Sequence, residues 1–393
     1  MSSIDWKMVF YEIIMSLLAF IRNIIDSVLS LMNSSFPVSR KIIKFDNGVK
    51  VRLGKKIAEG GFSFVFEAFD FTTNQKYALK RINCSDSELV RACRAEASVH
   101  RLLQHPNLLP LLGMKFDVSS SVSTVCYMLF PFMDVSLREE INKRMILRDD
   151  VADSERRPFL EQEVVILFTA IVDGLQAMHD AGLAHRDLKV ENIMLIKSKR
   201  GRGLMDPVIM DFGSARPLTV KLKDRKTVVN LFEEASTHST VTYRAPELFE
   251  GGCRHGPDEP DMDGRVDVWS LGCVLFAIMY GSSPFEVEFR TDGSVRIVEC
   301  THLRVIGDIP FPPPHTEAGN RYSHDIKDLL KWILNIDRSQ RPTLDDVSKR
   351  MDVLLQKLGA ESIIQTRKDK VKSMKFENHD IIINKRQSEM CFV

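Results

Sequence analysis

Two short segments, HRDLKVEN at residues 185–192 and MDFG at residues 210–213, dominate any interpretation of this chain. In the first, Asp187 supplies a carboxylate that can accept a hydroxyl proton, Lys189 a positive charge and Asn192 an amide oxygen for a metal ion. In the second, Asp211 supplies another short carboxylate for the metal. Asp211 follows Asp187 by 24 residues, and YRAPE comes after it at residues 243–247. This order and spacing exclude a chance match of the short DFG tripeptide.

Two further motifs precede these segments. Residues 57–65 read IAEGGFSFV between strand-like runs, and their small residues let a hairpin backbone approach a polyphosphate. A glycine pair at this place is also typical of an ordinary turn. Residues 77–82 read YALKRI, a strand in which Lys80 has an inward-facing phase. Glu96 on the following helical run would hold Lys80 toward α- and β-phosphates, whereas an exposed lysine on a sheet edge is the alternative.

The composition is that of an ordinary globular protein. The chain has 393 residues, a formal net charge of +1, 27% charged and 44% hydrophobic residues. No basic or acidic excess points to a nucleic-acid partner, and none is expected. The seven cysteines are scattered without a C-x-x-C pair, which indicates a reducing compartment. The sequence does not indicate an oligomeric state.

The order of secondary-structure signals predicts two unequal lobes. Strand-like runs at residues 50–58, 64–69 and 77–82 precede a helix at 87–103, and helical patterns dominate after residue 136. We expect a helix and linker over 1–43, a catalytic domain over 44–357 and a tail over 358–393. The two lobes are expected at 44–133 and 134–357. The fold class is therefore α+β, with a small β-rich lobe and a larger helical lobe.

With these motifs in this order, the chain resembles a eukaryotic serine/threonine protein kinase. The resemblance covers about residues 48–357 and implies ATP and Mg²⁺ as cofactors and Ser/Thr hydroxyls of proteins as acceptors. It implies Asp187, Lys189, Lys80 and Thr240 as catalytic residues, and Asn192 and Asp211 as metal ligands. The nucleotide-binding residues that it implies are Ile57, Ala58, Gly60, Gly61, Ser63, Val65, Ala78, Lys80, Glu96, Met133, Asn192, Met194 and Asp211.

Scaffold contacts follow from the same resemblance. It implies that Glu247 pairs with Arg341 and that Asp267 braces the catalytic loop, both as buried charges. His100, four residues after Glu96, is expected to pack in an internal stack rather than bind or catalyse. Met133, one of the implied nucleotide-binding residues, follows a run of apolar residues. Such a run is equally typical of a buried strand that binds no nucleotide.

A finer resemblance points to the Numb-associated kinase family, and most to its small Golgi-associated member. The evidence is the EGGFS loop at residues 59–63, the run EASVHRL at 96–102 and YRAPELF at 243–249. A long segment of 37 residues from Asp211 to Glu247 also agrees, and its amphipathic stretch at 226–235 predicts the extra helix of this family. Ala58 and Ser63 replace the first and third glycines of the general phosphate-loop pattern, and the second replacement is shared by this family.

An apolar segment at residues 8–32 stands apart from the rest of the chain. As a helix it places its polar residues on one stripe and Ile, Leu and Val on the opposite face. Three ionisable groups, Glu12, Arg22 and Asp26, disfavour a membrane span, since each would cost about 2–3.5 kcal/mol at the bilayer centre. We expect a membrane-surface helix, with a span and a helix docked on protein as alternatives. Neither a cleaved signal peptide nor N-myristoylation is expected, because no small-residue cleavage pattern follows and Ser2 follows Met1.

The sequence thus predicts an active kinase that is cytoplasmic and peripheral on an internal membrane, Golgi or endosomal, with a role in membrane trafficking or secretory-pathway signalling. The alternative is a nucleotide-binding pseudokinase that acts as a scaffold. A third possibility makes the N-terminal helix a partner-docking element of a soluble kinase. Thr237, Ser239, Thr240 and Thr242 are candidate autophosphorylation positions.

Overall fold

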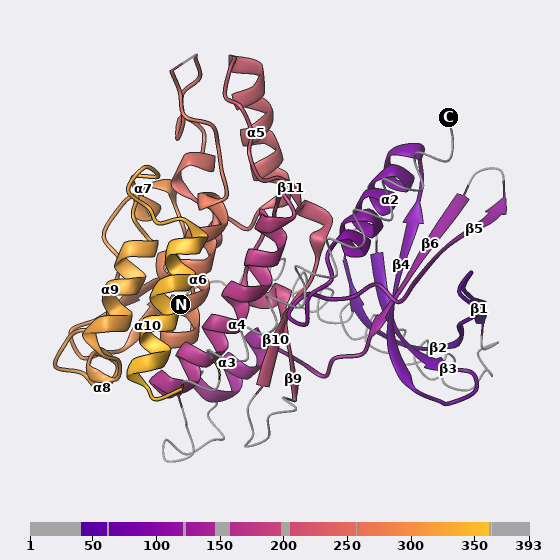
Figure 1. Ribbon diagram of the computed structural model, residues 1–393, viewed down its shortest axis with the longest axis horizontal. Coiled ribbons are helices and arrows are strands. Elements are labelled where there is room, and N and C mark those ends of the chain that lie inside the picture. Colours follow the sequence, from indigo (N-terminus) through magenta and orange to yellow (C-terminus); the bar gives the residue numbers. More distant parts are fainter. Residues whose placement is uncertain are drawn as a thin grey trace, which may run out of the picture.

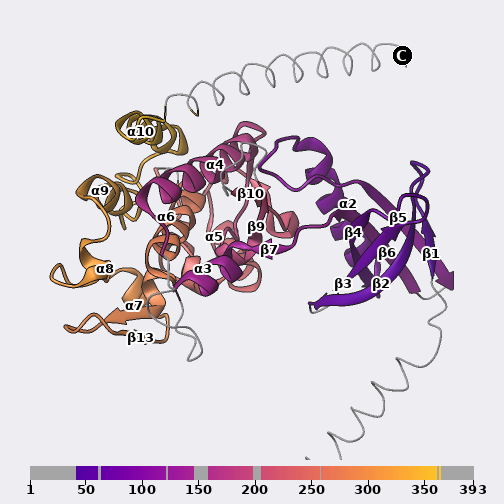
Figure 2. The ribbon, with the colours of Figure 1, turned by 90° about the horizontal axis from the view of Figure 1, so that it is seen from below.

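The protein folds into two lobes joined by the segment between β6 (Ser123–Pro131) and β7 (Val135–Ser136) (Figures 1 and 2). The computed structural model describes residues 41–60, 63–120, 123–145, 158–197, 205–256, 258–360 and 363. The predicted helix at 8–32 and most of the tail therefore lie outside the described residues. Within them, no helix has the length and apolar character needed to cross a bilayer.

The N-lobe is an antiparallel sheet of six strands with one helix, α2, packed on it. The strand order is β1-β2-β3-β4-β6-β5, and the β3–β4 register pairs Val65 with Lys80. Side chains of β4 alternate between two faces, so that Ile82 and Cys84 pack toward α2 while Leu79 packs on the opposite face. Lys80, two residues before Ile82, lies on the same face of β4 as Ile82 and Cys84, the face that packs toward α2. The strands of this sheet are β1 (Ile42–Lys44), β2 (Lys50–Glu59), β3 (Ser63–Asp70), β4 (Lys76–Cys84), β5 (Gly113–Ser120) and β6.

Helix α2 (Ser87–Leu102) matches the helix predicted at 87–103, and Asp86 caps its N-terminus. The Asp86 side chain accepts hydrogen bonds from the backbone N–H groups of Glu88 and Leu89 at 2.8 and 2.9 Å. Its buried face carries Cys93, Glu96, Ala97 and His100 at spacings of three and four residues. Glu96 is thus directed at the sheet by the same periodicity that packs the apolar residues.

The C-lobe is built around α6 (Arg265–Tyr280), a helix whose side chains are buried on all sides. Gly272 allows the close approach of α9, because a Cβ there would lie 2.6 Å from a side-chain carbon of Ile333. The other helices are α3 (Leu137–Met145), α4 (Glu161–Asp180), α5 (Arg225–His238), α7 (His302–Val305), α8 (Glu317–Asn320), α9 (His324–Ile333) and α10 (Leu344–Lys357). The extra helix expected near residues 226–235 is observed as α5.

Short strands and single turns connect these helices and carry the motif residues. The strands form three small antiparallel sheets, β7-β9-β10, β8-β11 and β12-β13. They are β7, β8 (Leu183–Ala184), β9 (Ile193–Lys197), β10 (Met205–Ile209), β11 (Arg216–Pro217), β12 (Val287–Phe289) and β13 (Val295–Ile297). The turns are η2 (Val190–Asn192), η3 (Phe212–Ser214), η4 (Val241–Tyr243), η5 (Pro246–Leu248) and η6 (Pro284–Glu286). The predicted α+β class with two lobes is confirmed.

Candidate active site

An ion pair links the two structural parts of the N-lobe. Lys80 on β4 places its Nζ 2.7 Å from Oε1 of Glu96 on α2. Burial lowers the pKa of Lys80, but the carboxylates of Glu96 and Asp211 outweigh this and raise the pKa above its ordinary value. The lysine therefore remains a positive charge near Asp211, as the sequence predicts for a phosphate-orienting residue.

Four groups hold the Asp187 carboxylate: two from Thr240, the Lys189 ammonium and, at 3.3 Å, Nδ2 of Asn192. Its Oδ1 accepts hydrogen bonds from the backbone N–H and the hydroxyl of Thr240, each at 2.8 Å. Its Oδ2 lies 2.8 Å from Nζ of Lys189, which also donates to the Thr240 hydroxyl at 2.7 Å. The result is a fixed carboxylate with a positive charge beside it, the arrangement that a base and its charge-balancing lysine require.

A fully buried carboxylate, that of Asp267 at the start of α6, fixes the backbone of the catalytic loop, residues 185–192. Asp267 accepts hydrogen bonds from the backbone N–H groups of His185 and Arg186 at 2.7 and 2.9 Å. His179 on α4 lies 3.0 Å from the same carboxylate. Burial alone would raise the pKa of Asp267, but the hydrogen bonds from His179 and from the backbone of Arg186 hold the pKa below its ordinary value. Asp267 thus stays ionised in the core and fixes the backbone that precedes Asp187.

Aromatic rings connect this loop to α2. The Phe212 ring lies 4.6 Å from the ring of His100 and 5.9 Å from that of His185, between centroids. His185 Nε2 donates to the carbonyl of Met210 at 3.1 Å. Burial lowers the pKa of His100, and its Nδ1 donates to the carbonyl of Leu109 at 2.8 Å. His100 is therefore a packed, neutral histidine, and the stack aligns Glu96 on α2 with the catalytic loop.

Asn192 and Asp211 carry the side-chain oxygens that the motifs imply as metal ligands. Asn192 donates from Nδ2 to the backbone carbonyl of Asp187 at 2.9 Å, which leaves its amide oxygen available. Asp211 has a positive φ of 64° at the start of η3. Amide and carboxylate oxygens suit Mg²⁺, which takes few protein ligands and completes its shell with phosphates and water. Among the described residues, no group of three or more His, Cys, Asp or Glu side chains forms a metal cluster. The residues fit a Mg²⁺ shared with a nucleotide.

The predicted nucleotide-contacting residues lie on the strands around the lobe junction. Ala58 pairs with Val65 across the β2–β3 hairpin, and the Gly60 N–H donates to the carbonyl of Ser63 at 2.8 Å. Ala78 pairs with Phe130 on β6, ahead of Met133. Ile57 is 42% exposed at the end of β2, and Met194 lies on β9. Gly61 lies outside the described residues.

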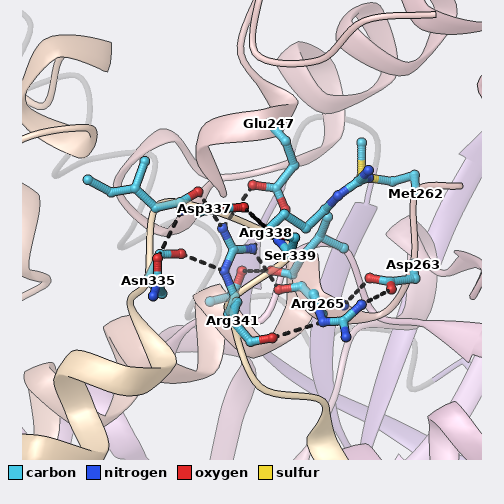
Figure 3. A network of polar contacts seen from close by, with 12 residues as sticks. Glu247, Met262, Asp263, Arg265, Asn335, Asp337, Arg338, Ser339 and Arg341 are labelled. Carbon is cyan, nitrogen blue, oxygen red and sulfur yellow. Dashed lines mark hydrogen bonds and ion pairs between the residues drawn. The ribbon is translucent and has the colours of Figure 1, made fainter. Parts of the chain in front are cut away.

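A second network of charged side chains joins Glu247 to the segment at residues 335–341 (Figure 3). Arg341 donates to both carboxylate oxygens of Glu247, at 2.7 and 3.0 Å, and both side chains are buried. The Arg341 guanidinium also donates to the backbone carbonyls of Arg265, Asn335 and Ile336. The Glu247–Arg341 pair expected from the resemblance is thus present as a structural contact.

Two arginines have environments that the motifs alone do not reveal. Arg138 on α3 pairs with Glu191 at 2.9 Å and donates to the Tyr243 hydroxyl at 3.3 Å. It also donates to the carbonyl of Gly281. Arg186 has a positive φ of 69° and no hydrogen-bond partner on any guanidinium nitrogen among the described residues. Its position in the HRD motif was visible in the sequence, but the missing partner was not.

Replacing Thr240 by alanine is expected to lower kcat. The substitution removes the hydroxyl that joins Asp187 to Lys189, and a hydrogen bond to a charged group contributes roughly 1.5–3 kcal/mol, or about tenfold to hundredfold. Steady-state phosphorylation of a serine peptide measures the loss. Thr240→Ser keeps the hydroxyl and should restore most of the rate, while Thr72→Ala, at an exposed turn position after β3, is the matched control. A wild-type kcat in Thr240→Ala would contradict the role.

Comparison with known proteins gives the class of this two-lobed fold and site. The model of the protein kinase domain matches residues 51–351. The chain belongs to the protein kinase family.

Similar proteins narrow the class from protein kinases in general to serine/threonine-protein kinases. Serine/threonine-protein kinase 16 of Mus musculus is 33% identical over 301 residues, which cover 76% of this chain and 88% of the relative. A probable serine/threonine-protein kinase of Dictyostelium discoideum is 28% identical over 369 residues, which cover 79% of this chain and 95% of the relative. A serine/threonine-protein kinase of Schizosaccharomyces pombe is 25% identical over 341 residues, which cover 79% of this chain and 93% of the relative. The chain is a serine/threonine-protein kinase, and the resemblance drawn from its motifs is confirmed.

Proposed function

We propose that the chain transfers the γ-phosphoryl of Mg-ATP to serine and threonine hydroxyls of proteins, with Asp187 as the catalytic base. The observation that carries this proposal is the Asp187 carboxylate, which lies 2.8 Å from both the Thr240 hydroxyl and Nζ of Lys189. Such a carboxylate orients the acceptor hydroxyl and takes up its proton, while Lys189 balances charge on the reacting oxygens. Mg-ATP, when bound, supplies the reactive phosphoryl group and neutralises the charge that develops on it.

The remaining residues position the nucleotide. Lys80, held by Glu96, provides a fixed positive charge for the α- and β-phosphates. Asn192 and Asp211 would hold the metal through their oxygens. Backbone N–H groups around Gly60 provide donors to phosphate, and Ile57, Val65, Ala78, Met133 and Met194 provide the apolar surface for adenine. Positioning and charge stabilisation together carry most of the catalysis in phosphoryl transfer, which needs little covalent chemistry from the protein.

A nucleotide-binding pseudokinase is the rival function. The chain retains each side chain that transfer requires, and the pairs Lys80–Glu96 and Asp187–Lys189 are formed. Incubation of the purified chain with Mg-ATP and serine, threonine and tyrosine peptides separates the two. We expect transfer to serine and threonine peptides. Binding of Mg-ATP without transfer to any of them would favour the scaffold instead.

Lys80→Met is expected to lower kcat/KM for ATP by about tenfold to hundredfold. The substitution removes one charged contact to the phosphates, and such a contact contributes roughly 1.5–3 kcal/mol. Methionine keeps the length of the side chain on β4, so the sheet is retained. Initial rates over a range of ATP concentrations measure the effect. Lys50→Met, an exposed lysine on β2, is the matched control, and an equal loss in both variants would refute the assignment.

We further propose that the kinase works at the cytoplasmic face of an internal membrane, in trafficking or secretory-pathway signalling. The support is the apolar face of the segment at residues 8–32, whose ionisable groups share one stripe. The apolar face would enter the headgroup layer while the charges remain hydrated. A protein partner that covers this face is the alternative.

Leu17→Asn is expected to weaken binding of the full chain to lipid vesicles roughly tenfold to hundredfold. Leu17 lies on the apolar face, and burial of a leucine side chain contributes about 1.5–3 kcal/mol. Co-sedimentation with neutral and anionic vesicles measures the partition. Ser27→Asn on the polar stripe is the matched control. If the unchanged chain fails to bind either vesicle, the membrane proposal fails, while the kinase proposal stands.

A further inference from the structure

The outer edge of the N-lobe sheet carries positive side chains that the proposed active site does not use. Ile42 pairs with Arg52 in the β1–β2 register, and Lys44 pairs with Lys50 beside them. Residues that pair directly across two strands share a face of the sheet, so these four side chains lie on one face, opposite to Ile43. Ile43 is 2% exposed, whereas both lysines are exposed. A group of cations therefore faces solvent along this edge.

The two lysines of this pair are not neutralised by contact. Lys44 and Lys50 form no salt bridge and no side-chain hydrogen bond with any described residue. Their neighbour Lys41, in contrast, lies 3.1 Å from the carboxylate of Asp117. Like charges directly opposite each other on neighbouring strands repel and destabilise the pair. An anionic surface placed against both lysines would remove that cost.

The carboxylates near this edge do not cancel its positive charge. Residues 42–52 contain three basic residues and one acidic residue, Asp46. Asp70, which ends β3 beside this edge, is engaged in its own turn. Its Oδ1 accepts hydrogen bonds from the backbone N–H groups of Thr72 and Thr73 at 2.8 and 2.7 Å. The edge thus keeps a net positive charge, which favours an anionic partner.

Exposed apolar side chains stand among these cations. Ile42 is 51% exposed and Phe71 is 61% exposed. The Phe71 N–H donates to the carbonyl of Lys50 at 2.9 Å, which places this aromatic residue beside the lysines. Exposed aromatic and aliphatic side chains next to lysines are typical of protein surfaces that enter the headgroup layer of a bilayer. The five residues that make up this surface, called the β1–β2 patch below, are Ile42, Lys44, Lys50, Arg52 and Phe71.

The start of β1 holds the patch close to the apolar segment at residues 8–32. Lys41 is anchored, because its Nζ lies 2.9 Å from the Tyr127 hydroxyl and 3.1 Å from the Asp117 carboxylate. Residues 33–40 separate it from the apolar segment, and eight extended residues span at most about 29 Å. Figures 1 and 2 place β1 at the end of the N-lobe that points away from the C-lobe. A membrane that receives the apolar segment is therefore within reach of the patch.

From these observations we propose that the β1–β2 patch is a lipid-binding surface that contacts the anionic headgroups of a membrane. The proposal rests on the proposed membrane association through residues 8–32, and it adds the charge of the lipid and the side of the kinase that faces it. Lys44, Lys50 and Arg52 bind headgroup phosphates and carboxylates. Ile42 and Phe71 enter the layer between these headgroups. The partner is thus a leaflet rich in anionic lipid rather than a neutral one.

Removal of the lysine charges tests the lipid class. Lys44→Gln combined with Lys50→Gln should weaken binding of the full chain to vesicles of phosphatidylserine and phosphatidylcholine by roughly tenfold to thirtyfold, since each lysine near an anionic surface contributes about fivefold. Binding to vesicles of phosphatidylcholine alone should stay unchanged. At an ionic strength of about 1 M the screening length falls to about 3 Å, and most of the difference should disappear. Co-sedimentation over a range of lipid concentrations measures the partition.

The matched control removes two exposed positive charges from the C-lobe. Lys349→Gln combined with Arg350→Gln on α10 makes the same change in net charge and should leave binding to both kinds of vesicle unchanged. Neither double variant should change kcat for a soluble serine peptide without vesicles. An equal loss of binding in the two double variants would overturn the proposal. No loss in the Lys44→Gln and Lys50→Gln variant would also overturn it and would leave the patch to an acidic protein partner.

A fluorescent side chain tests the location. Phe71→Trp places an indole at the patch, and its emission in excess of the wild type should be lost on phosphatidylserine vesicles that contain brominated phosphatidylcholine. Leu303→Trp, at a residue of α7 that is 78% exposed, is the control and should keep its emission. Unquenched emission in Phe71→Trp, or equal quenching in both variants, would overturn the proposal.

The same measurements separate this proposal from the membrane proposal on which it rests. Leu17→Asn should weaken binding to neutral and anionic vesicles alike, whereas the Lys44→Gln and Lys50→Gln variant should weaken binding to anionic vesicles only. If the wild type binds vesicles and the lysine variant binds them equally well, the patch proposal fails while the membrane proposal stands. If the wild type binds neither kind of vesicle, both proposals fail, and the kinase function is unaffected.

Discussion

Asp187→Asn is expected to lower kcat for phosphorylation of a serine peptide by about 10²–10⁴-fold. Asparagine has nearly the same shape as aspartate and retains hydrogen bonding within the loop, but it cannot accept the hydroxyl proton. General base catalysis contributes an effect of this size. Steady-state rates at saturating Mg-ATP measure the loss, and calorimetric titration of the nucleotide should give an affinity within about twofold of the wild type.

The comparison needs a control for nonspecific loss of activity. Asp328→Asn removes an exposed carboxylate on α9, far from the lobe junction, and should leave kcat unchanged. A rate in Asp187→Asn above about a tenth of the wild-type rate would show that another group accepts the proton. An equal loss of nucleotide affinity would instead assign Asp187 to binding.

Arg341→Met is expected to lower the free energy of unfolding by about 3–5 kcal/mol. Methionine fills part of the volume, but Glu247 would keep a buried charge without its partner. Three backbone carbonyls would also lose their donors. Urea unfolding followed by fluorescence measures the change, since Trp269 lies under the Arg341 guanidinium at 4.9 Å from its ring.

Two comparison variants separate the buried charge from other effects. Arg321→Met breaks a pair whose acidic partner, Glu317, is 88% exposed, and it should cost no more than about 1 kcal/mol. The double variant Arg341→Met with Glu247→Leu removes both buried charges and should recover part of the lost stability. If the double variant is less stable than Arg341→Met alone, the uncompensated charge is not the cause.

Much of the fold could be predicted from the sequence because its signals are local. The runs predicted as strands at 50–58, 64–69 and 77–82 are observed as β2, β3 and β4, each slightly longer. Helix α4, in the part of the chain predicted to be mainly helical, begins at Glu161, where Glu163 accepts a hydrogen bond from the Leu160 N–H. Element types follow from periodicity, whereas the exact ends depend on caps and pairing.

The site was only partly predictable, because its contacts join distant segments. Arg138 lies 105 residues before Tyr243 and 53 before Glu191, and no motif marks it. His179 reaches Asp267 across 88 residues of chain. Cysteines that look scattered in the sequence also meet, with the Sγ atoms of Cys84 and Cys93 3.8 Å apart where α2 packs on β4. None of these contacts has a local pattern.

The sequence by itself determined the class of protein and the identity of its reactive groups, because Asp187, Lys189, Asn192 and Asp211 lie at short, ordered spacings within motifs. The tertiary structure alone decided which charges are paired. Arg341 and Arg186 are both arginines in motifs, yet one makes five hydrogen bonds and the other makes none to the described residues. The physical reason is that burial and partner geometry depend on how separate helices and loops pack, and a guanidinium carries the same charge in either place.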